Sequence, residues 1–307
     1  MSQSAALPHM VTRFAPSPTG RLHVGHGWSA LMAMDMARAA GGAFRLRIED
    51  IDGARSRPEH VAGIVEDLAW LGIAWDGAIV FQSDRLAAYE AALVRLRAMQ
   101  LLYPCFCTRA DIAASASAPH GPEGTVYPGT CRGLSEAARA RRIAAGAPHA
   151  WRIDMAAAVA MAGEPGWATL PFPPKQNEVS TGAARTDLVE AHPLLAGDVV
   201  LARKDAAASY HLSCTLDDAF MGVTHVLRGD DLRAATDIHR LLQALLDLPS
   251  PIYIHHPLLI GADGKRLAKR SGSITLAQLR AQGIDPQCLA DDLRAGRFPV
   301  GIAVANA

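Results

Sequence analysis

The sequence predicts an α/β protein built on a doubly wound parallel sheet. Strand-like and helix-like segments alternate over residues 11–102, as in the first half of a nucleotide-binding catalytic domain. Strand-like segments return over residues 193–260 and are expected to form the second half. Between them, residues 103–192 are rich in Ala, Gly and Pro and have less regular apolar spacing, which is typical of an inserted module with long loops.

The first half begins with a short strand and a proline-stiffened turn, residues 13–26, which reads RFAPSPTGRLHVGH. Pro16 and Pro18 fix the φ angle, while Gly20 and Gly25 let the backbone approach a ligand closely. We therefore expect the phosphates of ATP to lie against this turn.

A helix is expected directly after this turn, and its start carries two histidines, His23 and His26. The apolar residues that predict the helix are Trp28, Leu31, Met32, Met34, Met36 and Ala39. A helix start has free N–H groups and a partial positive charge, and imidazoles there donate hydrogen bonds to phosphate oxygens. The pair is a candidate for stabilising the transition state of adenylate formation, the alternative being a loop with two ordinary polar histidines.

The second half contains the segments GDVVLARKD, YHLSCTLDDAF and GVTHVLRGDDL, and we expect all three to be strands. DIHRLLQALLDL is expected to be a helix, and PIYIHHPLLI a strand that leads into residues 261–307. There the apolar spacing of Leu276, Leu279 and Leu289 predicts one or two short helices.

The composition agrees with a soluble enzyme, which is expected to be cytoplasmic; the sequence does not determine the oligomeric state, and a monomer is the default expectation. Half of the residues are hydrophobic, and 30 basic residues balance 30 acidic ones, which argues against a broad, salt-driven nucleic-acid binder. Arg139, Arg141 and Arg142 form a local basic patch that either contacts phosphates or is a solvated helix face. No apolar run reaches the roughly 20 residues of a membrane helix, and the first residues lack the pattern of a signal peptide, so no membrane partner is expected.

Five cysteines in such a chain favour thiols or metal ligands over disulfides. Cys105 and Cys107 form a CxC pair, and with Cys131 they supply three of the four ligands of a zinc ion. Chemistry alone nominates His120 as the fourth ligand, although Tyr127 stands four residues before Cys131; the alternative is three cysteines without a metal. The remaining cysteines, Cys214 and Cys288, are expected in buried elements.

Four motifs in this order resemble the glutamyl branch of the class I aminoacyl-tRNA synthetases. RFAPSPTGRLHVGH resembles the branch signature, with HVGH as the HIGH element, and FRLRIEDID, ending at Asp52, resembles the strand with the amino-acid-binding glutamate. VTHVLRGDDL, from Val223, resembles the strand with a substrate-binding arginine, and GKRLAKRSG, from Gly264, resembles the lysine loop KMSKS. The resemblance implies a Rossmann-like catalytic core over nearly the whole chain.

Little chain follows the lysine loop, whereas full-length glutamyl-tRNA synthetases continue into a large helical anticodon-binding part. This difference points to the compact glutamyl-queuosine tRNA(Asp) synthetases, which have no anticodon-binding domain. The resemblance implies that the chain activates L-glutamate with ATP and Mg²⁺ and transfers it to queuosine in the anticodon of tRNA(Asp). It also implies Tyr127 as the fourth ligand of one structural zinc ion, so that residues 103–192 become a zinc-bearing, acceptor-binding-like insertion.

The resemblance also assigns the substrate-binding residues. Those implied for glutamate are Arg13, Phe14, Ala15, Pro16, Ser17, Glu49, Tyr210 and Arg228. Glu49 faces the substrate ammonium, and the two arginines bind its carboxylates in an order that stays open. Those implied for ATP are His23, Gly25, His26, Arg266 and Lys269, and His23, His26 and Lys269 are the catalytic residues among them. The loop departs from the KMSKS pattern at Ala268, where a serine hydroxyl is missing, and we expect slower activation at worst.

Three alternatives use part of the same evidence. A truncated conventional glutamyl-tRNA synthetase has the same motifs but normally needs anticodon contacts. A non-catalytic tRNA-binding regulatory paralogue tolerates loss of HVGH, Glu49 or Lys269, all of which are present. A ligase that joins an amino acid to a small molecule shares the adenylate chemistry, although paired Arg13 and Arg228 favour a dicarboxylic amino acid.

Overall fold

The computed structural model describes residues 10–52, 56–108, 110–112, 120–121, 124–163, 165–174, 186–267 and 274–305. The α-helices are α1 (Val24–Ala39), α2 (Pro58–Trp70), α3 (Leu86–Ala98), α5 (Glu136–Ala144), α6 (Met155–Ala162), α8 (Tyr210–Phe220), α9 (Ala235–Leu245), α10 (Leu276–Ala281) and α11 (Pro286–Arg294). The strands are β1 (Val11–Phe14), β2 (Ala43–Ile48), β3 (Val80–Phe81), β4 (Leu102–Cys105), β5 (His120–Gly121), β6 (Gly124–Thr125), β7 (Ala150–Ile153), β8 (Trp167–Thr169), β9 (Asp187–Val189), β10 (Val200–Ala202), β11 (His225–Gly229), β12 (Ile252–His256), β13 (Leu259–Ile260) and β14 (Ala303–Val304).

Two groups of strands form the central layer. β1, β2 and β3 pair in parallel, and in the second group, ordered β11-β12-β8-β9, the pairs β11–β12 and β12–β8 are parallel. The groups meet at β1, where the Thr224 N–H, just before β11, donates to the Val11 carbonyl at 2.9 Å. The prediction of an α/β protein with a parallel sheet is confirmed. Open sheets of this kind bind ligands where the strand order changes direction, here between β1 and β11.

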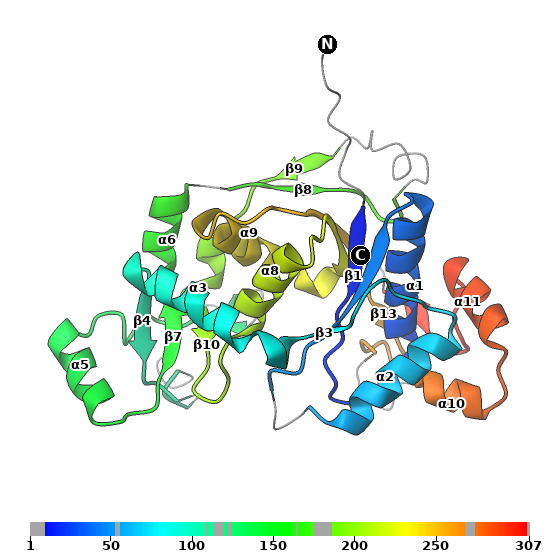
Figure 1. Cartoon of the computed structure of the whole chain (residues 1–307), viewed down its shortest axis with the longest axis horizontal. Helices are drawn as coiled ribbons and strands as arrows, with labels where there is room; N and C mark the ends of the chain where they lie inside the picture. The colour runs from blue at the N-terminus through cyan, green and yellow to red at the C-terminus, as the bar shows by residue number, and fades with distance from the viewer. Residues whose placement is uncertain are drawn as a thin grey trace, which may run out of the picture.

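Helices cover both faces of this layer. Figure 1 shows β1 and β2 between α1 on one side and α8 and α9 on the other. Leu31 of α1 packs with Phe44 and Leu46 of β2 in one hydrophobic core, while Leu93 of α3 and Leu241 of α9 belong to a second core. The expected helix after His26 and the expected helix DIHRLLQALLDL are both confirmed, as α1 and α9.

A smaller antiparallel sheet, ordered β10-β7-β4, lies toward the α5 end of the molecule (Figure 1). The segment GDVVLARKD forms a strand as expected, but that strand, β10, joins this antiparallel sheet and not the parallel one. The apolar run alone does not specify which strand β10 pairs with, because either sheet buries the same apolar side chains. Strands β8 and β9, which also lie in the range 103–192, instead extend the group of β11 and β12.

The prediction that YHLSCTLDDAF is a strand was wrong, because this segment forms helix α8. The alternation of Leu212, Cys214 and Leu216 resembles the period of a strand. The helix buries Asp217 and Asp218 as well, and both carboxylates contact arginines from distant segments. A pattern of hydrophobicity does not reveal that buried charges are paired. The pattern of this segment therefore indicated the two-residue period of a strand instead of the 3.6-residue period of a helix.

The last part of the chain forms α10 and α11, which confirms the expected short helices. Cys214 is buried as predicted, but the prediction for Cys288 was wrong, because it is exposed in the first turn of α11, after the N-cap residue Asp285. Over the described residues, no helix combines the length and apolar character of a membrane span.

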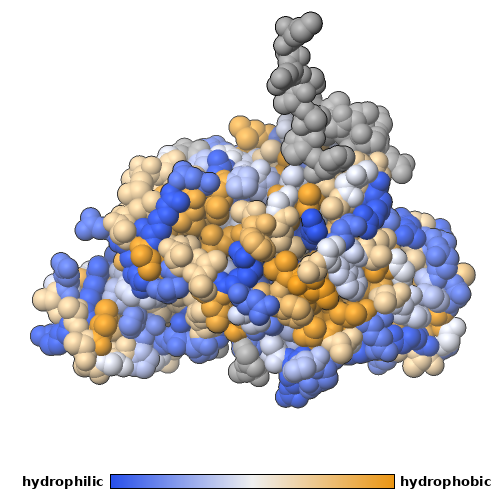
Figure 2. Space-filling view, in the orientation of Figure 1, coloured by the Kyte–Doolittle hydropathy of each residue, from blue (hydrophilic) through white to orange (hydrophobic). Residues whose placement is uncertain are grey.

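Helix α5 carries Arg139, Arg141 and Arg142 and buries none of its residues. Figure 2 shows hydrophilic side chains over this helix at the left end of the molecule. The side chain of Arg139 donates to the Arg132 carbonyl at 2.6 Å. Within this basic patch Arg141 and Arg142 are therefore exposed, whereas Arg139 is half-buried.

Candidate active site and metal centre

The start of α1 holds two histidine rings against each other. His23 is the N-cap residue, and its Nδ1 accepts a hydrogen bond from the Gly25 N–H at 3.1 Å. The His23 N–H donates to Nδ1 of His26 at 3.2 Å, so imidazoles occupy both places of a capping box, and the ring centroids are 3.7 Å apart. Because both Nδ1 atoms accept, the neutral rings carry their protons on Nε2, where they are able to donate to a phosphate oxygen.

A cavity of about 170 Å³ lies at this helix start. Its lining includes Phe14, His23, Gly25, His26, Ser29, Asp231, His256 and Arg266. A Cβ atom on Gly25 would lie 3.1 Å from Cε1 of His23, so glycine at this position keeps that ring in place. The structure thus brings together four of the residues predicted to bind ATP, and it adds Asp231, whose carboxylate pairs with Arg266 at 2.7 Å.

The described residues on either side of the lysine loop form hydrogen bonds with β13 and with the residue before His23. Lys269 and Ala268 lie outside the described residues, but Leu267 before them donates its N–H to the Leu259 carbonyl at 2.9 Å. After the loop, the Leu276 N–H donates to the Leu22 carbonyl, also at 2.9 Å. Because Leu22 directly precedes His23, this second hydrogen bond holds the residues that follow the loop close to the histidine pair.

A buried charge network lies at the carboxyl ends of β1 and β2. Arg13 donates from Nε to Asp218 at 3.1 Å, and Arg47 donates to the same carboxylate oxygen at 2.5 Å. Arg47 also donates to Glu49 at 3.1 Å. Burial opposes charge in this network, but the two guanidinium groups lower the pKa of Asp218 to about 2, and Asp218 raises the pKa of both arginines.

Glu49 directly follows β2, and its N–H donates to the Pro16 carbonyl at 3.1 Å, which holds the proline-rich turn against it. Burial raises the pKa of Glu49, and Arg47 partly offsets that effect. A second cation beside this carboxyl group favours its ionised form, so Glu49 suits an ammonium ligand. Phe14, Ala15 and Ser17 flank the same turn.

Arg228 of β11 is buried among neutral groups. It donates to the Tyr210 hydroxyl at 3.3 Å, to Nδ1 of His239 at 3.2 Å and to the Thr236 hydroxyl at 2.6 Å. Over the described part of the chain, no carboxylate forms an ion pair with its guanidinium group. A buried cation without an anionic neighbour is costly, so this position is suited to an anionic ligand.

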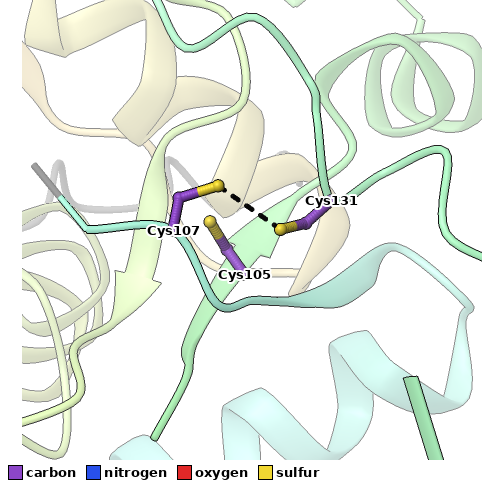
Figure 3. Close-up of side chains that lie close together, drawn as sticks. All are labelled: Cys105, Cys107 and Cys131. Carbon is purple, nitrogen blue, oxygen red and sulfur yellow. Dashed lines mark hydrogen bonds between the residues drawn. The ribbon is translucent and has the colours of Figure 1, made fainter. Parts of the chain in front are cut away.

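Three cysteines point toward one another at the end of β4 (Figure 3). The ligand atoms of Cys105, Cys107 and Cys131 all lie within 4.8 Å of one another, and the sulfurs of Cys107 and Cys131 are 3.5 Å apart. The hydroxyl of Tyr127 is 3.6 Å from the Cys107 sulfur and accepts the Cys131 N–H at 2.8 Å. The cluster can hold a metal ion; the side chain of His120, the other nominated ligand, lies outside the described residues.

The electrostatic surroundings of the cluster differ from thiol to thiol. Burial raises the pKa of Cys107 to about 11. Burial also acts to raise the pKa of Cys131, but hydrogen bonds from Tyr127 and from the Phe106 N–H outweigh it, so that the pKa is lowered. The Arg152 guanidinium lies 4.0 Å from the centre of the Tyr127 ring. Such a cation favours negative charge on the ligands of a bound metal ion.

A larger cavity, of about 870 Å³, lies between the cysteine cluster and the start of α8. Its lining includes Cys105, Cys107, Tyr127, Arg152, Arg203, Lys204, Tyr210, His211 and Asp237. Tyr210 therefore contributes both to the surroundings of Arg228 and to this cavity. The cavity thus lies between the predicted zinc site and Tyr210 of the predicted glutamate site.

A family model described as tRNA synthetases class I (E and Q), catalytic domain, matches residues 9–301. The chain belongs to this tRNA synthetase family. It is 50% identical to Glutamyl-Q tRNA(Asp) synthetase of Rhodobacter capsulatus over 286 residues, which cover 90% of this chain and 97% of that protein. It is 44% identical to the protein of the same name from Symbiobacterium thermophilum, over 92% of this chain and 84% of the relative.

The fold of this class I tRNA synthetase chain is similar to the crystal structure of a glutamate-tRNA synthetase from Elizabethkingia anophelis. The TM-score is 0.72 and the sequence identity 25%, over 92% of this chain. The chain spans 61% of that protein, so it matches less than two thirds of its length. The structural similarity therefore concerns the catalytic fold that the family model describes.

Sequence reasoning missed several site residues of this tRNA synthetase. Arg47 and Asp218 organise the network around Arg13, and Asp217 binds Gln82, Arg85 and Tyr89 beside it. The motif FRLRIEDID contains Arg47 two residues before Glu49, a spacing that places both on one side of a strand. That spacing was a usable signal for Arg47, whereas nothing local indicated the aspartates.

Proposed function

We propose that this chain activates L-glutamate with ATP and Mg²⁺ and transfers it to the queuosine base in the anticodon of tRNA(Asp). The names of the two relatives supply the acceptor, since both are called Glutamyl-Q tRNA(Asp) synthetase. The observation that supports a dicarboxylic amino acid as the substrate is the environment of Arg228. This buried cation lies beside Tyr210 and has no carboxylate partner over the described residues. A dicarboxylic amino acid supplies the missing anion.

In the first step, the glutamate α-carboxylate attacks the α-phosphorus of ATP, and pyrophosphate leaves. The α-carboxylate must therefore approach the small cavity, so we assign the side-chain carboxylate to Arg228 and Tyr210. Glu49 binds the ammonium group, with Arg13, Phe14, Ala15, Pro16 and Ser17 completing the pocket. The Nε2–H groups of His23 and His26 donate to phosphate oxygens, and Arg266 and Lys269 neutralise the departing pyrophosphate.

In the second step, a hydroxyl of the queuosine cyclopentenediol attacks the activated carbonyl. An ester forms, the bond between the carbonyl carbon and the phosphate oxygen breaks, AMP leaves with the electron pair, and the hydroxyl proton passes to the leaving phosphate group or to water. No covalent enzyme intermediate is required, and catalysis is mainly positioning and charge stabilisation. We place the acceptor in the larger cavity, because that cavity borders Tyr210 and is lined by Arg152, Arg203 and Lys204.

We further propose that Cys105, Cys107, Tyr127 and Cys131 hold one structural zinc ion in an acceptor-binding insertion, residues 103–192. Tetrahedral zinc with bonds to sulfur of about 2.3 Å places its sulfurs about 3.8 Å apart, close to the 3.5 Å between Cys107 and Cys131. Four protein ligands leave no open position, so the ion acts as a cross-link between β4 and the loop of Cys131.

The test is transfer of labelled glutamate by the purified protein, with ATP and Mg²⁺, to three acceptors: tRNA(Asp) with queuosine, tRNA(Asp) without it, and tRNA(Glu). Label on the queuosine-containing tRNA alone is the expected result. Label on tRNA(Glu) identifies a conventional glutamyl-tRNA synthetase, and absence of label from all three identifies a non-catalytic binding protein. Arg228→Gln is expected to lose transfer, while Arg240→Gln, at an arginine that donates to the Gly166 carbonyl, is the matched control.

A further inference from the structure

An ion-pair cluster joins the histidine segment, residues 21–26, to the part of the chain that follows the lysine loop. Arg21 donates from Nη2 to Asp67 at 3.0 Å and to Glu66 at 3.1 Å. Arg280 pairs with Glu66 at 2.9 Å and lies 3.8 Å from the same Asp67 oxygen, Oδ1. The two carboxylates are neighbours on α2, whereas Arg21 precedes α1 and Arg280 belongs to α10. None of the steps proposed above uses any of these four residues.

Asp67 lies at the centre of this cluster. Its side chain is fully buried, whereas those of Arg21 and Arg280 are 32% and 29% exposed. Burial raises the pKa of Asp67, and Arg21 partly offsets that effect. Apolar side chains of similar volume often stabilise a protein as well as a buried ion pair does. The distinctive property of such a pair is therefore the geometry that it fixes.

The sequence leaves room for Arg21 against α2. Gly63 lies inside this helix, where glycine is less favourable than alanine. A Cβ atom on Gly63 would lie 2.3 Å from Nη1 of Arg21. Gly63 and Asp67 are four residues apart and share one face of the helix. A larger side chain at position 63 would therefore push the guanidinium group away from Asp67.

Both arginines are attached to segments that meet beside His23. Arg21 is two residues before it, and the Leu276 N–H, at the start of α10, donates to the Leu22 carbonyl at 2.9 Å. Figure 1 shows α2 and α10 next to each other at the lower end of α1. Because Arg21 and Arg280 repel each other, the carboxylates that they share determine how closely α10 and the histidine segment approach.

The histidine rings follow the backbone at this junction. Nδ1 of His23 accepts from the Gly25 N–H, and Nδ1 of His26 accepts from the His23 N–H. A movement of Leu22 therefore moves both rings relative to the small cavity. Misplacement of a catalytic group by about 1 Å, caused by a change far from the chemistry, can slow a reaction on the order of 100-fold.

We infer that Asp67 is a positioning residue for the activation step. By binding Arg21 and Arg280 together, it holds the histidine segment and the start of α10 in the relative position that adenylate formation requires. Asp67 lines neither of the two cavities, so it acts through these arginines and not by contact with a substrate. The inference rests on the proposed function, because adenylate formation is the step that it concerns.

The test is Asp67→Asn, which keeps the size of the side chain and removes its charge. We expect kcat of glutamate-dependent ATP–pyrophosphate exchange to fall about tenfold, because the histidines are displaced. The KM for glutamate is expected to stay within about twofold of the parent value, since Glu49 and Arg228 keep their partners. Single-turnover transfer from enzyme-bound glutamyl adenylate to queuosine-containing tRNA(Asp) is also expected to stay within about twofold.

Asp35→Asn is the matched control. Asp35 of α1 pairs with Arg294 of α11 at 2.7 Å, so this ion pair also joins α1 to the C-terminal helices, but away from the histidines. Exchange by this variant is expected to stay within about twofold of the parent rate. Arg21→Gln, at a partly exposed position, replaces Asp67→Asn if that variant does not fold, and it is expected to slow exchange at least threefold.

The double variant tests whether Asp67 acts through Arg21. The Arg21→Gln change is expected to cost less exchange activity in the Asp67→Asn protein than in the parent, because the contact is already broken. Losses that simply multiply overturn this link.

Unchanged exchange by Asp67→Asn, or by Arg21→Gln in its place, overturns the inference. An equal fall of exchange and single-turnover transfer also overturns it, because that result indicates a general loss of structure. A parent protein without glutamate-dependent exchange overturns the proposed function itself. A parent that exchanges normally, with variants that match it, refutes the positioning role alone.

Discussion

Replacement of Asp218 by Asn tests the reasoning on the buried charge network. Asp218 is the carboxylate that both Arg13 and Arg47 contact, and the side chains are between 0% and 7% exposed. The variant keeps the size of the side chain but leaves two buried guanidinium groups facing one another without that negative charge. We expect the free energy of unfolding to fall by about 3–5 kcal/mol, the typical effect of breaking a buried ion pair.

The pH dependence of stability gives an independent magnitude. The folded structure lowers the pKa of Asp218 from its ordinary value of 3.8 to about 2, and at 1.36 kcal/mol per pKa unit this corresponds to roughly 2 kcal/mol. Because the folded pKa lies below the unfolded one, this contribution is fully present above pH 4. It is lost as the pH falls toward 2, and Asp218→Asn is expected to lack that part of the acid destabilisation.

The measurement is urea unfolding of parent and variant between pH 2.5 and 7. Asp230→Asn is the matched control, since Asp230 pairs with Arg233 on the surface, where both side chains are about half exposed, and should cost less than about 1 kcal/mol. If Asp218→Asn costs no more than this control at pH 7, the network does not stabilise the fold and the reasoning is refuted.

Three further predictions concern the sites themselves. Arg228→Gln should raise the KM for glutamate in ATP–pyrophosphate exchange by about 10- to 100-fold, because a charged hydrogen bond is lost, and an unchanged KM would contradict the carboxylate assignment. Cys107→Ser should lower the zinc content measured by atomic absorption from one ion per chain, whereas the exposed control Cys288→Ser should keep it. Gly25→Ala places a methyl group 3.1 Å from the His23 ring and should slow exchange several-fold; Gly133→Ala, where nothing lies within 4 Å, should not, and equal rates for both would rule out that contact.

Local signals explain what the sequence predicted well. The apolar spacing after His26 specifies α1, and the proline-rich turn before it belongs to the same few residues, so the histidine pair needed no distant partner. The cysteine cluster is similar, because Cys105 and Cys107 share one strand end and Cys131 follows after a short module. The two histidines are three residues apart and the CxC cysteines two, and in each case the residue types already indicate the chemistry.

Long-range pairing explains what the sequence did not predict. Asp218 is 205 residues from Arg13 and 171 from Arg47, so nothing near it in the sequence shows that this buried aspartate is paired. The alternation of Leu212, Cys214 and Leu216 favoured a strand where the structure has helix α8. Antiparallel β10 was placed in the parallel sheet for a related reason, since its three residues fit either partner.

Arg13 and Arg228 show why the substrate roles needed the structure. In sequence they are two arginines in strand-like segments, and their roles came from the resemblance alone. In the structure Arg13 already has the Asp218 carboxylate, whereas the described neighbours of Arg228 are a phenol, a hydroxyl and imidazoles. The fold therefore neutralises the charge of Arg13 but supplies no anion beside Arg228. A dicarboxylic substrate supplies that anion. The difference between two chemically identical side chains therefore lies in their partners, and it supports our proposal that Arg228 binds a carboxylate of the substrate.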